Sequence, residues 1–328
     1  MPVPEALRGR LRLPVIAAPM FLVSGPDLVV ACCRAGIVGS FPSLNQRSTE
    51  GFEAWLGEIE ERLARAADAG ESPAPYPAPY AVNLIVHRTN ARLEQDLERC
   101  VAHRVPLVIT SLGANAEVVE AVQGYGGLVF HDVVNLRHAE KAAAAGVDGL
   151  ILVCAGAGGH AGTLSPFAFL PEVRRLFQGT IVLAGAMGSG RAVAAAEMLG
   201  ADLAYMGTRF IATQESLAPA AFKQMILEGR AADVVYTDGV SGVPGNFLAP
   251  SIRAAGLDPA ALVRPDGYRA KTGSEEGAKA WRDIWSAGQG IGAIDDLPAV
   301  ADCVERLAEE RRAAWQAAAE AASAGGAG

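Results

Sequence analysis

Residues 149–163 read GLILVCAGAGGHAGT, a short apolar run that stops at small residues and a single histidine. Such a run predicts a buried strand, and glycines at its end let the backbone turn tightly or approach a ligand closely. His160 is the one residue of this loop that can exchange a proton near neutral pH. We therefore expect a functional loop at the end of this strand. The plainer alternative is that the glycines only turn the chain and that His160 is a surface or core histidine.

Two more glycine-rich strand ends follow at similar intervals, LAGAMG at residues 183–188 and YMGT at residues 205–208. Ligands gather at the C-terminal ends of parallel strands, where such loops meet. The repeated pattern favours the functional interpretation of the histidine loop over the plainer one.

Apolar runs and amphipathic segments alternate over most of the chain. The runs are typical of strands buried on both faces, which occur in parallel sheets covered by helices. Strands are expected at residues 14–20, 37–42, 80–85, 105–111, 128–133, 149–152, 180–183 and 202–206. Helices are expected at residues 26–35, 49–67, 90–103 (with Asn90 as N-cap), 115–122, 138–145, 171–177, 190–199 and 217–227, and residues 71–79 are too proline-rich for either.

Eight strand-helix units predict a (β/α)8 TIM barrel, whose active site lies over the C-terminal ends of the strands. An open doubly wound sheet is the alternative, but it would place the candidate residues of strands one, three, five, six, seven and eight too far apart to meet. We expect the barrel to span residues 1–230. Residues 231–328 would form a mainly helical appended region that completes the domain, with turns at 237–246 and helices near 277–285 and 297–322.

The composition limits the partners. The chain has 328 residues, of which 51% are hydrophobic, and a formal net charge of -8, which gives no basic surface for nucleic acid or an anionic membrane. No apolar stretch approaches the ~20 residues needed to span a bilayer, and the first residues lack a signal-peptide pattern, so we expect a cytoplasmic protein. The five cysteines lack metal-ligand or disulfide spacing, and nothing in the sequence activates Cys154, which we expect to serve packing.

The glycines that end strands seven and eight resemble the phosphate site of many barrels, where backbone N–H groups hold the anion. The alternative is that they only permit tight turns. The chain has no GxxxxGK[ST] loop and no strand-linked GxGxxG fingerprint, so a ligand with one phosphate fits better than a nucleoside triphosphate. The residues expected to form this cradle are Gly185, Gly188, Gly207 and Thr208.

Small and amide side chains stand at the other strand ends: Ala18, Pro19, Met20, Asn83 and Ser111. This lining suits a flat, hydrogen-bonding, redox-active ring better than hydrolysis, which would need paired acids or a nucleophile with a base.

Several of these segments together resemble the nitronate monooxygenase family, formerly called 2-nitropropane dioxygenases. They are AAPM at 17–20, the Asn83 strand, AGAGGHAG at 155–162, AGAM at 184–187, MGTRF at 206–210 and, nearer the C-terminus, WSAGQG at 285–290. The resemblance implies an FMN-dependent barrel with His160 as the catalytic residue. It implies that FMN binds to Ala18, Pro19, Met20, Asn83, Ser111, Gly158, Gly159, Gly185, Ala186, Gly188, Gly207 and Thr208, with His131 and Gln289 as further lining and no metal.

Two positions depart from the family pattern. Ala186 follows Gly185 where many relatives have a second glycine, and Asp132 follows His131 where many have a lysine. A carboxylate near the flavin would oppose the reduced, anionic ring. Either Asp132 points away from the ring or this branch works differently.

The resemblance implies oxidation of alkyl nitronates by O2 to carbonyl compounds and nitrite. His160 would take the proton of a neutral nitroalkane or hydrogen-bond the nitronate oxygens. Two alternatives stay open: an NAD(P)H-dependent FMN reductase acting on a quinone or an enoyl thioester, and a flavin-free phosphate-binding barrel. The appended helices are expected either to cover the barrel mouth or to pair subunits in a homo-oligomer.

Overall fold

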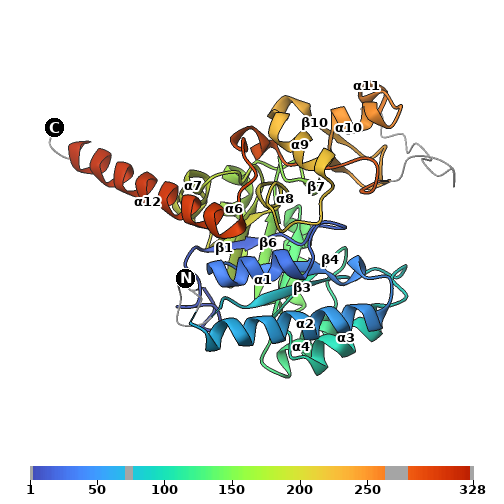
Figure 1. Ribbon diagram of the computed structural model, residues 1–328. Helices are drawn as coiled ribbons and strands as arrows, with labels where there is room; N and C mark the ends of the chain where they lie inside the picture. The colour runs from blue at the N-terminus through green and yellow to red at the C-terminus, as the bar shows by residue number, and fades with distance from the viewer. Residues whose placement is uncertain (1–2, 71–76, 263–279, 326–328) are drawn as a thin grey trace.

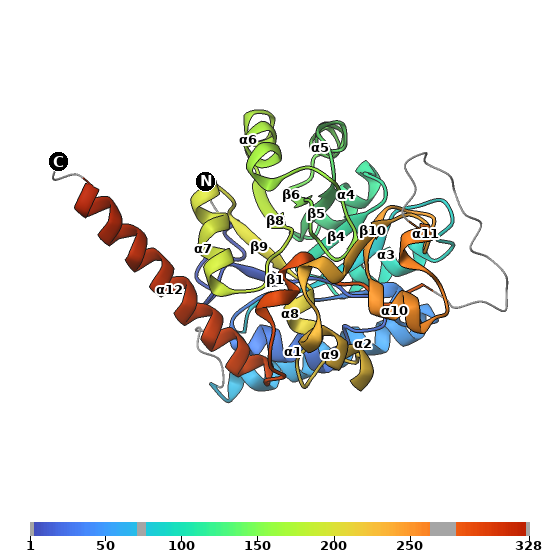
Figure 2. The ribbon, with the colours of Figure 1, turned by 90° about the horizontal axis from the view of Figure 1, so that it is seen from above.

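Eight parallel strands form a barrel in the computed structural model, which describes residues 3–70, 77–262 and 280–325 (Figures 1 and 2). Their order is β1-β9-β8-β6-β5-β4-β3-β2. The two ends of this series also meet, because Val38 N donates to Val15 O at 3.0 Å and Ala17 N donates to Val38 O at 2.8 Å. The closed series confirms the barrel and excludes an open sheet. The strands are β1 Val15–Ala17, β2 Gly39–Pro42, β3 Tyr80–Ile85, β4 Leu107–Ser111, β5 Leu128–Val133, β6 Gly149–Val153, β8 Thr180–Ala184 and β9 Leu203–Met206.

The barrel is filled by apolar side chains. Ile16, Leu107, Phe130, Ile151 and Val182 belong to one buried cluster, and none of the five exposes any measurable surface. A second, larger cluster packs the strands against the helices outside them. Both faces of each strand are therefore covered, which explains why the strands read as continuous apolar runs.

Helices surround the strands, as Figure 2 shows from above for α4, α5, α6 and α7. Side-chain caps begin several of them: Ser48 accepts a bond from Gly51 N, and Asn135 accepts one from His138 N. Gly36 and Gly200 end two of them in the left-handed conformation. The helices are α1 Pro26–Ala35, α2 Thr49–Asp68, α3 Leu93–Ala102, α4 Ala116–Gln123, α5 Leu136–Ala144, α6 Pro166–Leu176, α7 Gly190–Leu199, α8 Thr208–Ile211 and α9 Ala220–Glu228.

Two predicted helix starts were wrong. Helix α3 begins at Leu93 with Arg92 as its N-cap, because the Asn90 side chain instead bridges Ile85 O and Arg92 N. Helix α6 begins at Pro166, a proline in the first turn, and not at the expected Pro171, which lies inside the helix.

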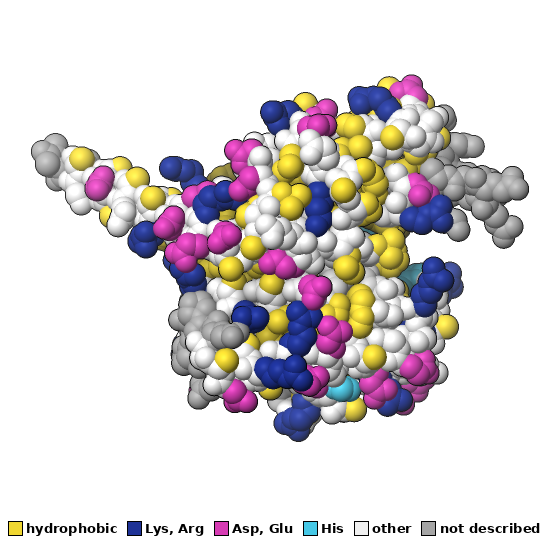
Figure 3. Space-filling view, viewed as in Figure 1, with side chains coloured by type: hydrophobic (Ala, Val, Ile, Leu, Met, Phe, Trp, Pro, Cys, Tyr) yellow, Lys and Arg dark blue, Asp and Glu magenta, His cyan; other side chains and the backbone are white. Residues whose placement is uncertain are grey.

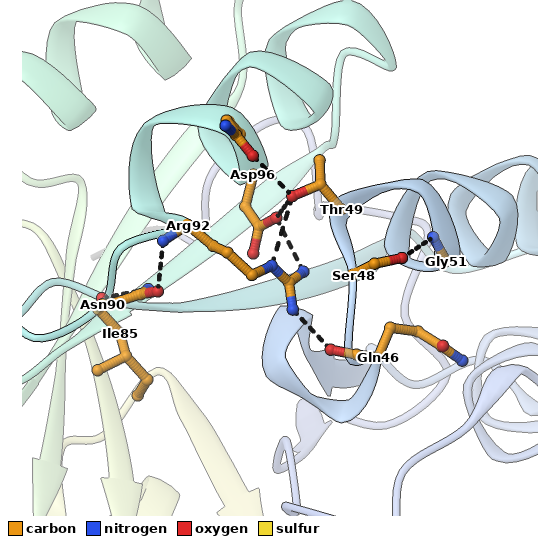
Figure 4. Close-up of polar contacts among 9 residues, drawn as sticks. Gln46, Ser48, Thr49, Gly51, Ile85, Asn90, Arg92 and Asp96 are labelled. Carbon is orange, nitrogen blue, oxygen red and sulfur yellow. Dashed lines mark hydrogen bonds and ion pairs between the residues drawn. The ribbon is translucent and has the colours of Figure 1, made fainter.

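A buried ion pair fixes the loops near the barrel mouth (Figure 4). Arg92 lies 2.9 Å from the fully buried Asp96 and also donates to Gln46 O at 2.6 Å. These bonds anchor the segment after β2, which contains the 3-10 helix η1 Ser43–Asn45. Asn45 in turn accepts a bond from Leu22 N at 2.9 Å. The network thus holds the loop that follows β1, where three of the candidate site residues lie.

The region after residue 231 contains a β-hairpin whose two strands were not predicted, and the turns expected at 237–246 fall mainly in the connection between them. Strands β10 Val234–Thr237 and β11 Gly245–Leu248 pair antiparallel, and β11 also pairs with β7 Gly159–His160. A Cβ on Gly245 would lie 2.7 Å from Gly159 O, so the close approach of the two strands requires glycine at that position. The expected helix at 277–285 was also wrong in its described part, because Ala280 and Ile284 form a bridge instead; residues 277–279 lie outside the described residues.

The remaining elements are α10 Ala249–Ala254, α11 Pro259–Leu262, η2 Ala231–Asp233, η3 Gln289–Ala293 and α12 Val300–Gly325. Helix α12 packs on the barrel wall through Arg311, which donates two 2.6 Å bonds to Glu197 of α7. Its C-terminal part extends away from the body (Figure 1). Among the described helices, none is long and apolar enough to cross a membrane.

Charged side chains of both signs are interspersed over the face shown in Figure 3. Hydrophobic side chains gather on its upper half, where Figure 1 places α9 and the hairpin region.

Candidate active site

A cavity of about 1330 Å³ opens at the C-terminal ends of the barrel strands. Most of the predicted site residues line it: Ala18, Pro19, Met20, Asn83, Ser111, His131, Gly158, Gly159, His160, Gly207 and Thr208. The structure therefore brings together residues from the ends of β1, β3, β4, β5, β6 and β9, which lie far apart in the sequence. Gly185, Ala186, Gly188 and Gln289 do not line the cavity.

The loop after β6 carries His160, whose side chain is exposed to the cavity. The hairpin of β10 and β11 is hydrogen-bonded to this loop: Asn246 donates to Ala157 O at 2.6 Å, and Tyr236 donates to Ala161 O at 3.2 Å. The edge of Trp281 meets the His160 ring, with centroids 5.3 Å apart. Among the described residues, none hydrogen-bonds a ring nitrogen of His160, so both nitrogens are available to a ligand. Burial by surrounding atoms lowers the pKa of His160 and favours the neutral ring.

The ends of β1 and β9 form a wall of small groups. Ala18 N donates to Met206 O at 2.9 Å, and this bond places Pro19 and Met20 beside Gly207. A Cβ on Gly207 would make only ordinary contacts, the closest at 3.6 Å. Packing therefore does not require glycine here, and its effect is to leave the cavity wall open.

A polar chain crosses the floor of the cavity from β3 to β5. Asn83 Nδ2 donates to Ser111 Oγ at 2.8 Å, and Ser111 Oγ donates to Asp132 Oδ2 at 2.6 Å. The other carboxyl oxygen, Asp132 Oδ1, is buried and has no hydrogen-bond partner in the described part of the chain. Burial raises the pKa of Asp132 to about 6, although the bond from Ser111 acts in the opposite direction. Asp132 lines the cavity and lies two positions after Phe130 on β5, so its side chain is on the inner face of the barrel, where Phe130 also lies.

His131 is buried beside this chain, with Nδ1 2.7 Å from Thr110 Oγ1. Burial, assisted by nearby His138, lowers the pKa of His131 to about 4. The ring is therefore neutral over the usual pH range, because burial disfavours its charged form.

The four candidate residues outside the cavity lie where the loops after β6 and β8 meet η3. Gln289 N and Ala186 N both donate to Gly156 O, at 2.8 and 3.2 Å. A Cβ on Gly188 would collide with Gly290 O. The backbone of η3 therefore lies directly against Gly188. Only the half of the expected phosphate cradle formed by Gly207 and Thr208 faces the cavity.

Sequence reasoning missed several lining residues. Tyr205 lies two positions before Gly207 on β9, and its position at a strand end was the available signal. Further lining residues come from the region after residue 231: Tyr236, Trp281, Trp285 and Ser286. Trp281 and Trp285 were expected in a helix, and no element was expected at Tyr236 or Ser286. The resemblance of residues 285–290 to the family was the available signal for Trp285 and Ser286.

The chemistry of the site rests on a few polar groups in an apolar cavity. No group of three or more His, Cys, Asp or Glu within the described ranges is arranged to hold a metal ion. Cys154 is buried, and burial raises the pKa of its thiol to about 12, which disfavours a nucleophilic thiolate. Proton transfer and hydrogen bonding by His160, and hydrogen bonding by the Asn83, Ser111 and Asp132 chain, are the available functions.

The fold and this arrangement define a (β/α)8 barrel with a ligand site at the C-terminal ends of its strands. The family model described as nitronate monooxygenase matches residues 58–310, and the chain belongs to that family. It is therefore an oxidoreductase.

Among the proteins similar to this chain are the following three. The chain is 27% identical to a nitronate monooxygenase of Paraburkholderia phytofirmans over 90% of its length and 92% of that protein. It is 26% identical, over 90% of its length and 91% of the relative, to the (3aS,4S,5R,7aS)-5-hydroxy-7a-methyl-1-oxo-octahydro-1H-indene-4-carboxyl-CoA dehydrogenase of Rhodococcus jostii. The structure of a nitroalkane oxidase from Streptomyces ansochromogenes superposes with a TM-score of 0.76 at 24% identity, covering 95% of this chain and 99% of that one, which supports the fold.

Proposed function

We propose that this enzyme uses FMN to oxidise alkyl nitronates with O2, giving carbonyl compounds and nitrite. The observation that carries the proposal is the position of His160. Its ring nitrogens have no partner among the described residues, and it opens on a cavity whose far wall is built of small groups. A neutral histidine facing a flat, open wall suits a proton transfer beside a bound ring.

The cavity residues fit FMN in size and character. A volume of about 1330 Å³ exceeds the ~300–1,000 Å³ usual for ligand sites, so a ring system and a substrate have room together. When bound, FMN supplies the electron transfer that protein side chains lack. Those that would hold it are Ala18, Pro19, Met20, Asn83, Ser111, Gly158, Gly159, Gly207 and Thr208, with Gly207 and Thr208 nearest to the expected place of the phosphate.

His160 would perform the proton chemistry of the substrate. With a neutral nitroalkane, an unprotonated ring nitrogen accepts the proton from the carbon next to the nitro group. With a preformed nitronate, the N–H of the same neutral ring donates a hydrogen bond to a nitronate oxygen. The lowered pKa of His160 keeps the ring neutral for both tasks.

The test is the visible spectrum of the purified protein, recorded without oxygen while propyl nitronate or NADH is added. Flavin bands that bleach with the nitronate and persist with NADH are the expected result, and nitrite release on admission of air would follow. Bands that bleach with NADH alone would overturn the proposal in favour of a reductase. A protein that takes up no FMN would overturn the cofactor as well and leave a flavin-free phosphate-binding barrel.

A second candidate function is NAD(P)H-dependent reduction of a quinone or an enoyl thioester. The observation that favours it is the extent of the cavity, whose lining continues along α5 to His138 and Lys141. This is further than a small nitronate requires, and a CoA thioester could extend in that direction. The similar protein of Rhodococcus jostii is named for action on a carboxyl-CoA compound. Bleaching of the flavin by NADH, followed by reoxidation with an enoyl-CoA, would distinguish this function.

A further inference from the structure

Asp132 is the one acidic side chain among the described residues that line the cavity. The other ionisable groups of the lining are His131 on the same strand, His138 and Lys141 on α5, His160 on β7, and Tyr205 and Tyr236 on β9 and β10. None of the described lysine, arginine or histidine side chains forms an ion pair with Asp132. An ionised Asp132 would therefore carry a negative charge at the cavity floor with no cation in contact.

The hydrogen bonds of Asp132 support a neutral carboxyl group. Neutral groups alone form the chain from Asn83 through Ser111, and it reaches only Oδ2. Oδ1 is buried and unpartnered in the described structure. A buried carboxylate with one oxygen unsatisfied is costly, whereas a protonated carboxyl group can leave one oxygen unpaired at much lower cost. Tyr205 offers no compensation, because the proximity of Asp132 helps to raise its pKa and keep it neutral too.

We propose that Asp132 determines the charge preference of this cavity: in its neutral form the cavity accepts small anions, and in its ionised form it excludes them. The basis is the position of Asp132 on the cavity floor: within the described residues it is the single carboxyl group of the lining, it has no cation in contact, and it is hydrogen-bonded on one oxygen only. The raised pKa of Asp132, about 6, places the change between the two forms within the working range of most enzymes. The inference goes beyond the proposed function, because it holds whatever ring or substrate the cavity binds.

The experiment compares an anion with a neutral molecule of the same shape. Binding of propionate and of propionamide to the protein as purified is measured by calorimetry between pH 5.5 and pH 8. For the wild-type protein we expect the dissociation constant of propionate to rise at least ~tenfold over this range, since the neutral fraction of a carboxyl group falls tenfold per pH unit above its pKa. The affinity for propionamide should stay constant.

Two substitutions should change this result in different ways, and a third serves as the control. Asp132→Asn should bind propionate at pH 8 more tightly than the wild type does, and its remaining pH dependence should be no larger than the part that protonation of His160 contributes. Ser111→Ala removes the hydrogen bond that stabilises the ionised form, so the loss of propionate affinity should move to higher pH. Glu117→Gln, on the exposed surface of α4, changes the net charge as Asp132→Asn does and should leave the wild-type pH dependence intact.

Three outcomes would overturn the proposal: propionate that fails to bind at pH 5.5, a pH dependence in Asp132→Asn as large as that of the wild type, or an equal dependence for propionamide. Infrared difference spectra of the wild type and Asp132→Asn give a second readout. They should show a carboxyl band that titrates near pH 6 in the wild type and is missing in the variant, whether or not the protein oxidises nitronates.

Discussion

Asn246 Nδ2 donates a 2.6 Å hydrogen bond to Ala157 O, and this bond joins the C-terminal hairpin to the loop that carries His160. Both residues are buried. The barrel supplies the strand before the histidine, but the hairpin 89 residues later in the chain fixes the histidine itself. The region after residue 231 is thus part of the site.

Asn246→Ala should lower activity and stability together. The substitution leaves Ala157 O buried without its donor, which typically costs about 1–3 kcal/mol, and it frees the loop that presents His160. We expect a fall in kcat and a lower urea midpoint. Tyr236→Phe removes a longer, partly exposed bond to the same loop and should have a smaller effect on both. Equal effects of the two variants would contradict the special role of Asn246.

His160→Asn should reduce kcat/KM for a neutral nitroalkane by about 10²–10⁴-fold, the usual contribution of a general base. In the wild type, kcat/KM should fall as the pH drops below the pKa of His160, which burial holds below its ordinary value of 6.5, because the protonated ring cannot accept a proton. The variant should lose this dependence, and a preformed nitronate should suffer a smaller loss. His87→Asn, at a histidine outside the cavity lining, is the control. An unchanged rate in His160→Asn would refute the assignment.

Glycines differ in whether the packing around them leaves room for a side chain, and alanine substitutions at Gly188 and Gly57 test this difference. Gly188→Ala would push a Cβ against Gly290 O, displace η3 and destabilise the protein by about 1–3 kcal/mol, as overpacking does. Gly57→Ala, in the middle of α2 with no atom within 4 Å of the added Cβ, should instead stabilise it by about 0.5–1 kcal/mol. Thermal unfolding of both variants checks the two signs. A Gly188→Ala variant as stable as the wild type would show that η3 does not pack against Gly188.

The barrel could be predicted because its strands are encoded locally. A run such as LVFHDV is buried on both sides and bounded by helical patterns, so β5 was placed without error at Leu128–Val133. The same logic located His160, Asn83 and Gly207, because the ends of parallel strands must meet once the barrel closes.

Contacts made by distant segments could not be predicted in this way. The sequence around Gly188 does not indicate that the backbone of Gly290 lies against it, because the two residues are 102 positions apart and only the folded chain brings them together. The hairpin was missed for a different reason. Val234 to Tyr236 is a short β-branched and aromatic run, which is typical of a strand. Its partner is β11, and β11 also pairs with the histidine loop, so the hairpin depends on a contact with a distant part of the chain.

Asp132→Asn should increase stability at alkaline pH. Burial raises the pKa of Asp132 from 3.8 to about 6, so the folded state binds this proton more tightly than the unfolded state does. The resulting contribution to the free energy of unfolding is fully present below pH 3.8 and is lost as the pH rises to 6. Above pH 6 the ionised side chain therefore lowers stability by up to about 3 kcal/mol relative to acid pH. Asparagine carries no charge and escapes this loss. Urea unfolding at pH 4.5 and pH 8 should show a larger gain of the variant over the wild type at pH 8 than at pH 4.5, because only part of the loss has occurred at pH 4.5. A gain that is equal at both pH values would mean that Asp132 ionises in the folded protein as it does in water.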